Sequence, residues 1–125
     1  MGKIITCSLS QMHQYDADYK FFVVLRPGKV HVQGLRHKPD LAPSAELFQW
    51  AQEHKHESNW FDAYSKQFCY DMQHRPGLRD AVKQLEALAA EHSVLLVCFC
   101  PDPLTCHRSL IATELQRRGV EVELH

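Results

Sequence analysis

The chain has 125 residues, a formal net charge of −1 and a hydrophobic content of 45%, which fits one domain, residues 1–125, around one core. The near-zero charge argues against general nucleic-acid binding, which depends on an excess of Lys and Arg. No apolar run approaches the roughly 20 residues of a membrane-spanning helix, and the N-terminus lacks the apolar middle of a signal peptide. Because the five cysteines are an odd number, we expect reduced thiols and a cytoplasmic location.

Two strands are expected in the first part of the chain. The first is "KIITCSLS", residues 3–10, and the second is "YKFFVVLRP", residues 19–27. The apolar run of the second strand does not alternate, which indicates burial on both faces. The Gly- and Pro-containing stretch that follows Pro27 is predicted to be a long loop.

Three helices are expected next. Ser44 can cap the first, and Ser58 or Asn59 can cap the second. Residues 78–89 carry the clearest helical stripe of apolar residues, after the break at Pro76-Gly77. We expect Trp50, Trp60, Phe61 and Tyr64 to lie in the core and His54-Lys55-His56 to form a solvated face.

The C-terminal part predicts a strand, a helix and a strand. "VLLVCFC", residues 94–100, is a buried strand, and residues 107–118 form a helix that Gly119 ends. "VEVEL" alternates like a half-exposed edge strand. Such a β-α-β unit is parallel and right-handed. We therefore predict an α/β fold, a single three-layer domain with a mostly parallel sheet and several helices in the middle of the chain.

Candidate site residues lie where strands of this sheet end. In parallel sheets, sites form beyond the carboxyl ends of the strands, and Ser8, Arg26 and the loop before the last helix meet this condition. Cys106 lies at the start of that helix, whose free N–H groups favour a thiolate. His107 and Arg108 add positive charge beside it. The same N–H groups with Arg108 could instead bind a phosphate or carboxylate beside an idle thiol.

A second thiol, Cys100, is placed to approach Cys106 across the loop and form a reversible disulfide. Cys98 lies two residues earlier on the same side of the strand and is expected in the core. The spacing C-x5-C-H is not a usual zinc signature, which relies on C-x2-4-C pairs. We therefore predict no metal site, and the sequence indicates no cofactor.

The chain resembles the small proteins grouped as domain-of-unknown-function family 488. The resemblance is carried, in the family's order, by "FFVVLRPGK", "LAPSAELFQW", "WFDAYSKQFCYDM" and "VLLVCFCPDPLTCHRSLIATELQRRGVEVE". It implies an α/β fold and points to Arg26, Cys98, Cys106, His107 and Arg108. Family members often carry an acid where this chain has Cys100. The resemblance implies no particular activity, substrate or cofactor.

Three functions remain open from the sequence. The first is a thiol-dependent enzyme acting on a small anionic or phosphorylated molecule, with Cys106 as nucleophile and His107 as proton shuttle. Arg26, Arg108 and Ser8 would then hold the anion. The second is a non-catalytic module that binds an anion or nucleotide. The third is a redox sensor that uses Cys100 and Cys106.

Overall fold

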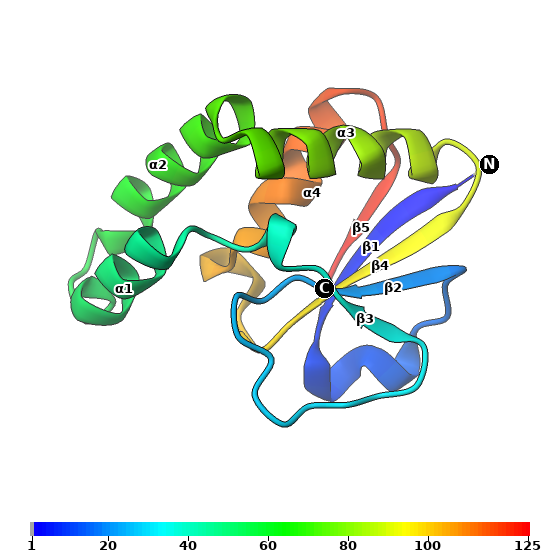
Figure 1. Ribbon diagram of the computed structural model, residues 1–125, viewed down its shortest axis with the longest axis horizontal. Coiled ribbons are helices and arrows are strands. Elements are labelled where there is room, and N and C mark those ends of the chain that lie inside the picture. The colour runs from blue at the N-terminus through cyan, green and yellow to red at the C-terminus, as the bar shows by residue number, and fades with distance from the viewer. Residues whose placement is uncertain (1) are drawn as a thin grey trace.

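The computed structural model describes residues 2–125 and contains one five-stranded sheet in the order β3-β2-β4-β1-β5, with every neighbouring pair parallel (Figure 1). The predicted α/β fold is confirmed, and the sheet is entirely parallel. The strands are β1 Lys3–Ser8, β2 Tyr19–Phe22, β3 Leu35–His37, β4 Ser93–Cys98 and β5 Val122–Leu124. The α-helices are α1 Ala45–His54, α2 Trp60–His74, α3 Pro76–Ala89 and α4 His107–Arg117.

The apolar run of β4 explains its place at the centre of the sheet. Its neighbours are β2 on one side and β1 on the other, and Val94 to Val97 are fully buried. A strand covered on both faces needs such a continuous apolar sequence. The site residues that follow β4 are therefore attached to the most firmly held strand of the sheet.

The α-helices lie on one side of the sheet, where α3 and α4 pack against the strands and α1 and α2 extend beyond the strands' carboxyl ends (Figure 1). The crossovers from β3 to β4 and from β4 to β5 move in the same direction across the sheet, so right-handed connections place their helices on one side. The opposite face carries the 3-10 helix η1, Leu9–Gln14, which Figure 1 shows below the sheet. The predicted first strand, residues 3–10, thus ends at Ser8 because the chain turns into η1.

The predicted loop after Pro27 is wrong in one part, because it contains the edge strand β3. Residues 35–37 pair with Lys20 to Phe22 of β2, although Leu35 is their only apolar residue. A short 3-10 helix, η2, follows at Pro39–Leu41. Three residues with one apolar side chain give no periodic signal, so pairing with a neighbour decides their conformation.

The helix ends follow the sequence signals. Ser44 Oγ accepts a hydrogen bond from the Leu47 N–H at 3.0 Å. Asn59 occupies the N-cap position of α2, but its side chain makes no capping hydrogen bond. Gly119 has a φ of 96°, which is the left-handed conformation that commonly ends a helix. Among residues 2–125, no helix combines the length and apolarity needed to cross a membrane.

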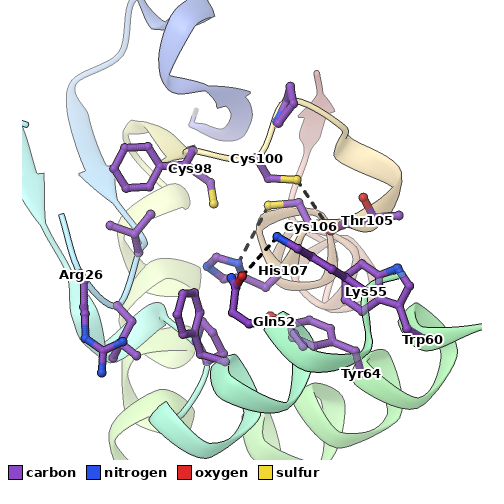
Figure 2. Close-up of a pocket in the computed structure, with 17 residues that line it drawn as sticks. Arg26, Gln52, Lys55, Trp60, Tyr64, Cys98, Cys100, Thr105, Cys106 and His107 are labelled. Carbon is purple, nitrogen blue, oxygen red and sulfur yellow. Dashed lines mark hydrogen bonds between the residues drawn. The ribbon is translucent and has the colours of Figure 1, made fainter. Parts of the chain in front are cut away.

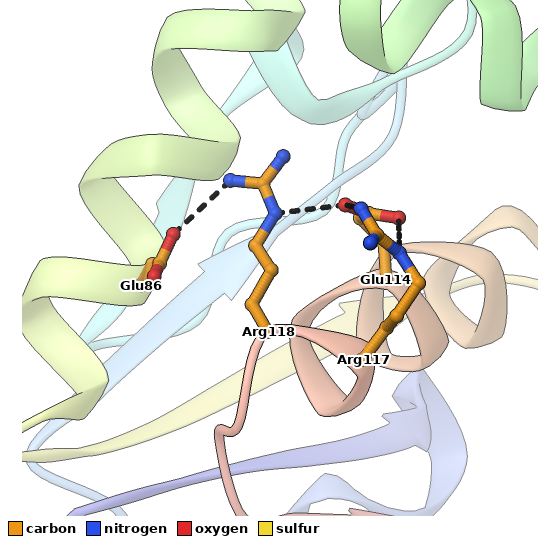
Figure 3. Close-up of polar contacts among 4 residues, drawn as sticks. All are labelled: Glu86, Glu114, Arg117 and Arg118. Atoms are coloured by element: carbon orange, nitrogen blue, oxygen red, sulfur yellow. Dashed lines mark hydrogen bonds and ion pairs between the residues drawn. The ribbon is translucent and has the colours of Figure 1, made fainter.

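Ion pairs tie α4 to α3 (Figure 3). Arg118 donates from Nε to Glu114 Oε2 at 2.8 Å and from Nη1 to Glu86 Oε1 at 3.1 Å. Arg117 also donates to Glu114, from Nη2, at 2.6 Å. Hydrogen bonds from Arg117, and then from Arg118, hold the pKa of the Glu114 carboxyl below its usual value. This end of α4 is thereby fixed against the helix layer, while its other end faces the candidate site.

Candidate functional site

A cavity of about 680 Å³ lies beyond the carboxyl ends of β2 and β4 (Figure 2). This volume is within the ordinary range for small-molecule sites, and the position is the one expected in a parallel sheet. The walls come from the residues after β2, from α1 and α2, and from the loop between β4 and α4. Arg26 and Lys55 are its only Lys or Arg, and no Asp or Glu is found among its lining residues.

Cys106 and His107 come together in this cavity because Cys106 is not yet helical. Its φ of −132° and ψ of 140° are extended, and α4 begins at the next residue. Successive residues within a helix point about 100° apart. Because Cys106 is extended, this separation does not apply to Cys106 and His107, and their side chains can meet. Cys106 Sγ lies 3.9 Å from His107 Nδ1, and both residues are buried, at 3% and 7% exposure.

The other ring nitrogen of His107 fixes the tautomer. His107 Nε2 lies 2.5 Å from the carbonyl oxygen of Val23. Because a carbonyl can only accept, Nε2 donates and carries the proton. In the neutral ring, Nδ1 then presents its lone pair to the thiol of Cys106. This is the arrangement of a base beside a nucleophile, with the base oriented by a third group.

The acceptor and the ring are themselves held in place. The Val23 N–H donates to the Val97 carbonyl at 2.9 Å, which extends the β2–β4 pairing by one residue. The ring of Phe68 packs edge-on against His107, with 5.6 Å between centroids. The orientation of His107 is thus set by the sheet and by α2 together.

Cys98 is the third member of the cluster. The Sγ atoms of Cys98 and Cys106 and a ring nitrogen of His107 all lie within 4.8 Å of one another. Figure 2 shows the three side chains pointing toward one another. The hydrogen bond from Cys106 lowers the pKa of the Cys98 thiol, although burial opposes the shift. Cys98, expected in the core, is buried but also lines the cavity.

Cys100 lies at the edge of this cluster. Its Sγ donates to the Thr105 carbonyl at 3.8 Å and to the Asp102 carbonyl at 3.5 Å. The hydrogen bond with Cys106, followed by burial, raises the pKa of the Cys100 thiol. All five cysteines are free thiols. Cys100 and Cys106 are therefore neighbours, as the predicted thiol pair requires.

The predicted anion-binding residues separate into two groups. Arg26 lines the cavity, and its guanidinium lies over the ring of Phe48, 5.7 Å from the centroid. Ser8 does not line it; its Oγ is hydrogen-bonded to Gln11 Oε1 at 3.0 Å. Arg26, Cys106 and His107 thus share one cavity, and Ser8 lies outside it.

Arg108 also lies outside the cavity, fully buried beneath the loop. Its Nη1 donates to the Cys100 carbonyl at 2.6 Å, and its Nη2 donates to the His125 carbonyl at 3.0 Å. Its Nε has no hydrogen-bond partner within the described residues. In this arrangement, Arg108 supports the backbone of the loop between β4 and α4. Its charged atoms do not face a ligand in the cavity.

Three further residues line the cavity, although the sequence did not mark them as site residues. Tyr64 is buried in the core as expected, Trp60 packs half-buried against it, and Lys55 is exposed as expected. All three also line the cavity. Burial, and then the nearby thiols, raise the pKa of Tyr64, so its hydroxyl stays protonated and can donate a hydrogen bond. Lys55 Nζ donates to Gln52 Oε1 at 3.1 Å. No sequence signal indicated that Lys55, an exposed residue that follows α1, also borders the cavity.

Together these features define an all-parallel α/β protein with a Cys-Cys-His cluster in a pocket at the carboxyl edge of its sheet. The family model described as the Active DUF488-N3 subclade matches residues 4–119. The chain therefore belongs to the DUF488 family, as the Cys-His-Arg motif and its surroundings predicted. Comparisons with curated proteins and with solved structures gave no match.

Proposed function

We propose that this chain is a thiol-dependent enzyme that acts on a small anionic or phosphorylated substrate, with Cys106 as the nucleophile. One observation carries the proposal: the Nδ1 lone pair of His107 faces Cys106 Sγ while Nε2 is engaged by the Val23 carbonyl. The 3.9 Å separation is long for a hydrogen bond, but such contacts often tighten when substrate binds. The chemistry needs reduced cysteines, which the predicted cytoplasmic location would maintain.

The proposed step is a covalent group transfer. His107 Nδ1 takes the proton of the Cys106 thiol, and the sulfur electron pair forms a bond to the electrophilic atom of the substrate. The bond from that atom to the leaving group breaks, and the leaving group departs with the electron pair and receives the proton from Nδ1. Water then attacks the sulfur-bound intermediate, which releases the second product and restores the thiol.

The charge of the cavity supports an anionic substrate. Arg26 and Lys55 are not offset by any acidic side chain of the lining. Tyr64 adds a protonated hydroxyl close to the thiols. Aromatic walls from Phe48 and Trp60 leave room for an apolar portion of the substrate.

Alkylation with two reagents of the same size and different charge tests both parts of the proposal. Iodoacetate is anionic and iodoacetamide is neutral, and each transfers its carbon to the thiolate while iodide leaves. Mass spectrometry after partial labelling should find the label first on Cys106. The double variant Arg26→Gln, Lys55→Gln should lower the iodoacetate-to-iodoacetamide rate ratio about sevenfold, because each of the two charges removed contributes about 0.6 kcal/mol at roughly 7 Å in water. Lys83→Gln, on an exposed face of α3, is the matched control.

Three results would count against parts of this proposal. First label on Cys98 would move the nucleophile to the end of β4, and an unchanged rate ratio would remove the anion preference. The non-catalytic anion-binding module would be favoured by two observations together. Inorganic phosphate would bind Cys106→Ser as well as the native protein, and native Cys106 would show no preferred labelling.

Peroxide sensing by Cys100 and Cys106 is the second candidate, favoured by the position of both thiols in the wall of one cavity. Hydrogen peroxide would oxidise the pair to a disulfide and be reduced to two molecules of water. Free-thiol counts before and after mild peroxide should fall by two in the native protein, and Cys100→Ser should not form the bond. Survival of both thiols would exclude this function.

A further inference from the structure

We propose that Cys98, Cys106 and His107 form a binding site for a thiophilic divalent cation of the Zn²⁺ type, and that the bound ion blocks the Cys106 thiol. The site rests on three convergent ligand atoms, all buried, from the end of β4 and the start of α4. Ion binding stands independently of the proposed enzyme, and only the blocking effect concerns the same thiol. The spacing rule missed the site because it considered Cys100 as the partner of Cys106.

The distances fit a tetrahedral ion after small side-chain movements. With Zn–S near 2.3 Å and Zn–N near 2.0–2.1 Å, tetrahedral angles require S···S of about 3.8 Å and S···N of about 3.6 Å. The distance from Cys106 Sγ to His107 Nδ1 is 3.9 Å, close to the second value. All pairs in the cluster are within 4.8 Å, so side-chain shifts of about 1 Å would complete the geometry.

The ring of His107 has the surroundings of a metal ligand. A ligating histidine typically donates its second ring N–H to a carbonyl or carboxylate, which fixes the tautomer and the ring plane. The Val23 carbonyl performs this role at 2.5 Å. Nδ1 is therefore free to offer its lone pair without losing a proton, whereas the two thiols release one proton each on binding.

The fourth coordination position would face the cavity. The three ligand residues line its wall, and three protein ligands with one open position characterise catalytic rather than structural zinc sites. Two thiolates balance the charge of a divalent ion, so the positive charges of Arg26 and Lys55 would favour an anion or hydroxide as the fourth ligand. When the ion is bound, both the sulfur of Cys106 and the base nitrogen of His107 are occupied, and alkylation should stop.

Cobalt titration of the full chain, reduced and without oxygen, tests the ion site. Co²⁺ should give thiolate charge-transfer bands and intense tetrahedral bands that saturate at one ion per chain, and Zn²⁺ should displace it, as expected from its higher affinity. Cys98→Ser and His107→Gln should each weaken binding by more than the 10–100-fold that loss of an outer hydrogen-bond partner costs. Cys69→Ser, an exposed thiol of α2, should leave the spectrum unchanged.

Protection from alkylation tests the blocking effect separately. Zn²⁺ should slow labelling of Cys106 at least tenfold in the native protein, with Cys69 labelled at its metal-free rate. The absence of charge-transfer bands, or equal spectra for Cys98→Ser and native protein with both folded by circular dichroism, would overturn the site. If cobalt binds but Cys106 of the metal-free protein shows no preferred labelling, the ion site stands and the proposed enzyme is refuted. If Cys106 is labelled first but cobalt does not bind, only the ion site is refuted.

Discussion

Replacing His107 by Gln or by Asn separates the roles of its two ring nitrogens. A Gln side chain can place an amide N–H near the position of Nε2 and keep the hydrogen bond to Val23, but it offers no base toward Cys106. An Asn side chain is too short to reach the Val23 carbonyl. The pair of variants thus removes the base alone, or the base together with the buried hydrogen bond.

The expected magnitudes follow from the contacts. Both variants should slow Cys106 alkylation by iodoacetamide at neutral pH by about 10²-fold, the lower end of what a positioned base contributes. His107→Gln should lower the free energy of unfolding by about 1 kcal/mol, since the edge-on contact with Phe68 is lost. His107→Asn should cost about 1–3 kcal/mol more, because the Val23 carbonyl loses its buried partner.

Mass-spectrometric alkylation rates and urea unfolding, followed by tryptophan fluorescence, measure the two effects on the same samples. Cys106→Ser reports the background labelling of the other four thiols. Native alkylation rates in His107→Gln would refute the role of the base. Equal stability of the Gln and Asn variants would refute the assignment of the proton to Nε2.

Three further predictions concern stability. Glu114→Gln should cost about 1–2 kcal/mol at pH 7, because the partly buried Arg118 loses its charged acceptor. The pKa of Glu114 in the folded protein is lowered from 4.5. The stability difference between native protein and Glu114→Gln should therefore persist above pH 4.5 and disappear as the pH falls through that lowered pKa. Urea titrations at several pH values measure this. Gly119→Ala should cost about 1 kcal/mol in urea unfolding, because its φ of 96° strains any side chain although nothing lies within 4 Å of the added carbon. Gly77→Ala, at the start of α3 with an ordinary 3.8 Å contact to Asp40, should instead raise the melting temperature, a gain of about 0.5–1 kcal/mol.

The elements with strong local signals could be predicted from the sequence. The apolar run before Cys98, the Ser44 cap and Gly119 each act within a few residues, so their structures follow from neighbours along the chain. The edge strand β3 could not be predicted because its single apolar residue, Leu35, gives no period. It forms because the backbone of β2 offers it a partner.

The site was predictable in its position but not in its internal contacts. Strand ends and the start of the last helix indicated Arg26, Cys106 and His107 as neighbours, since parallel sheets gather such ends at one edge. The burial of Arg108 depends on carbonyls eight and seventeen residues away, which no local pattern encodes. The contact between Cys106 and His107 depends on the extended backbone of Cys106, a detail of one residue.

The register of β4 has a consequence for how correct folding of this chain can be recognised. Cys98 lies opposite Ser8 of β1, and a slip of one position would turn its sulfur to the other side of the sheet. A chain with that register error could be compact and rich in helix, yet it would lack the cluster of Cys98, Cys106 and His107. Measuring refolding yield by the recovery of the cobalt absorption bands would therefore count only chains with the native strand register. Circular dichroism alone would overestimate that yield, because it also counts helical chains with the wrong register.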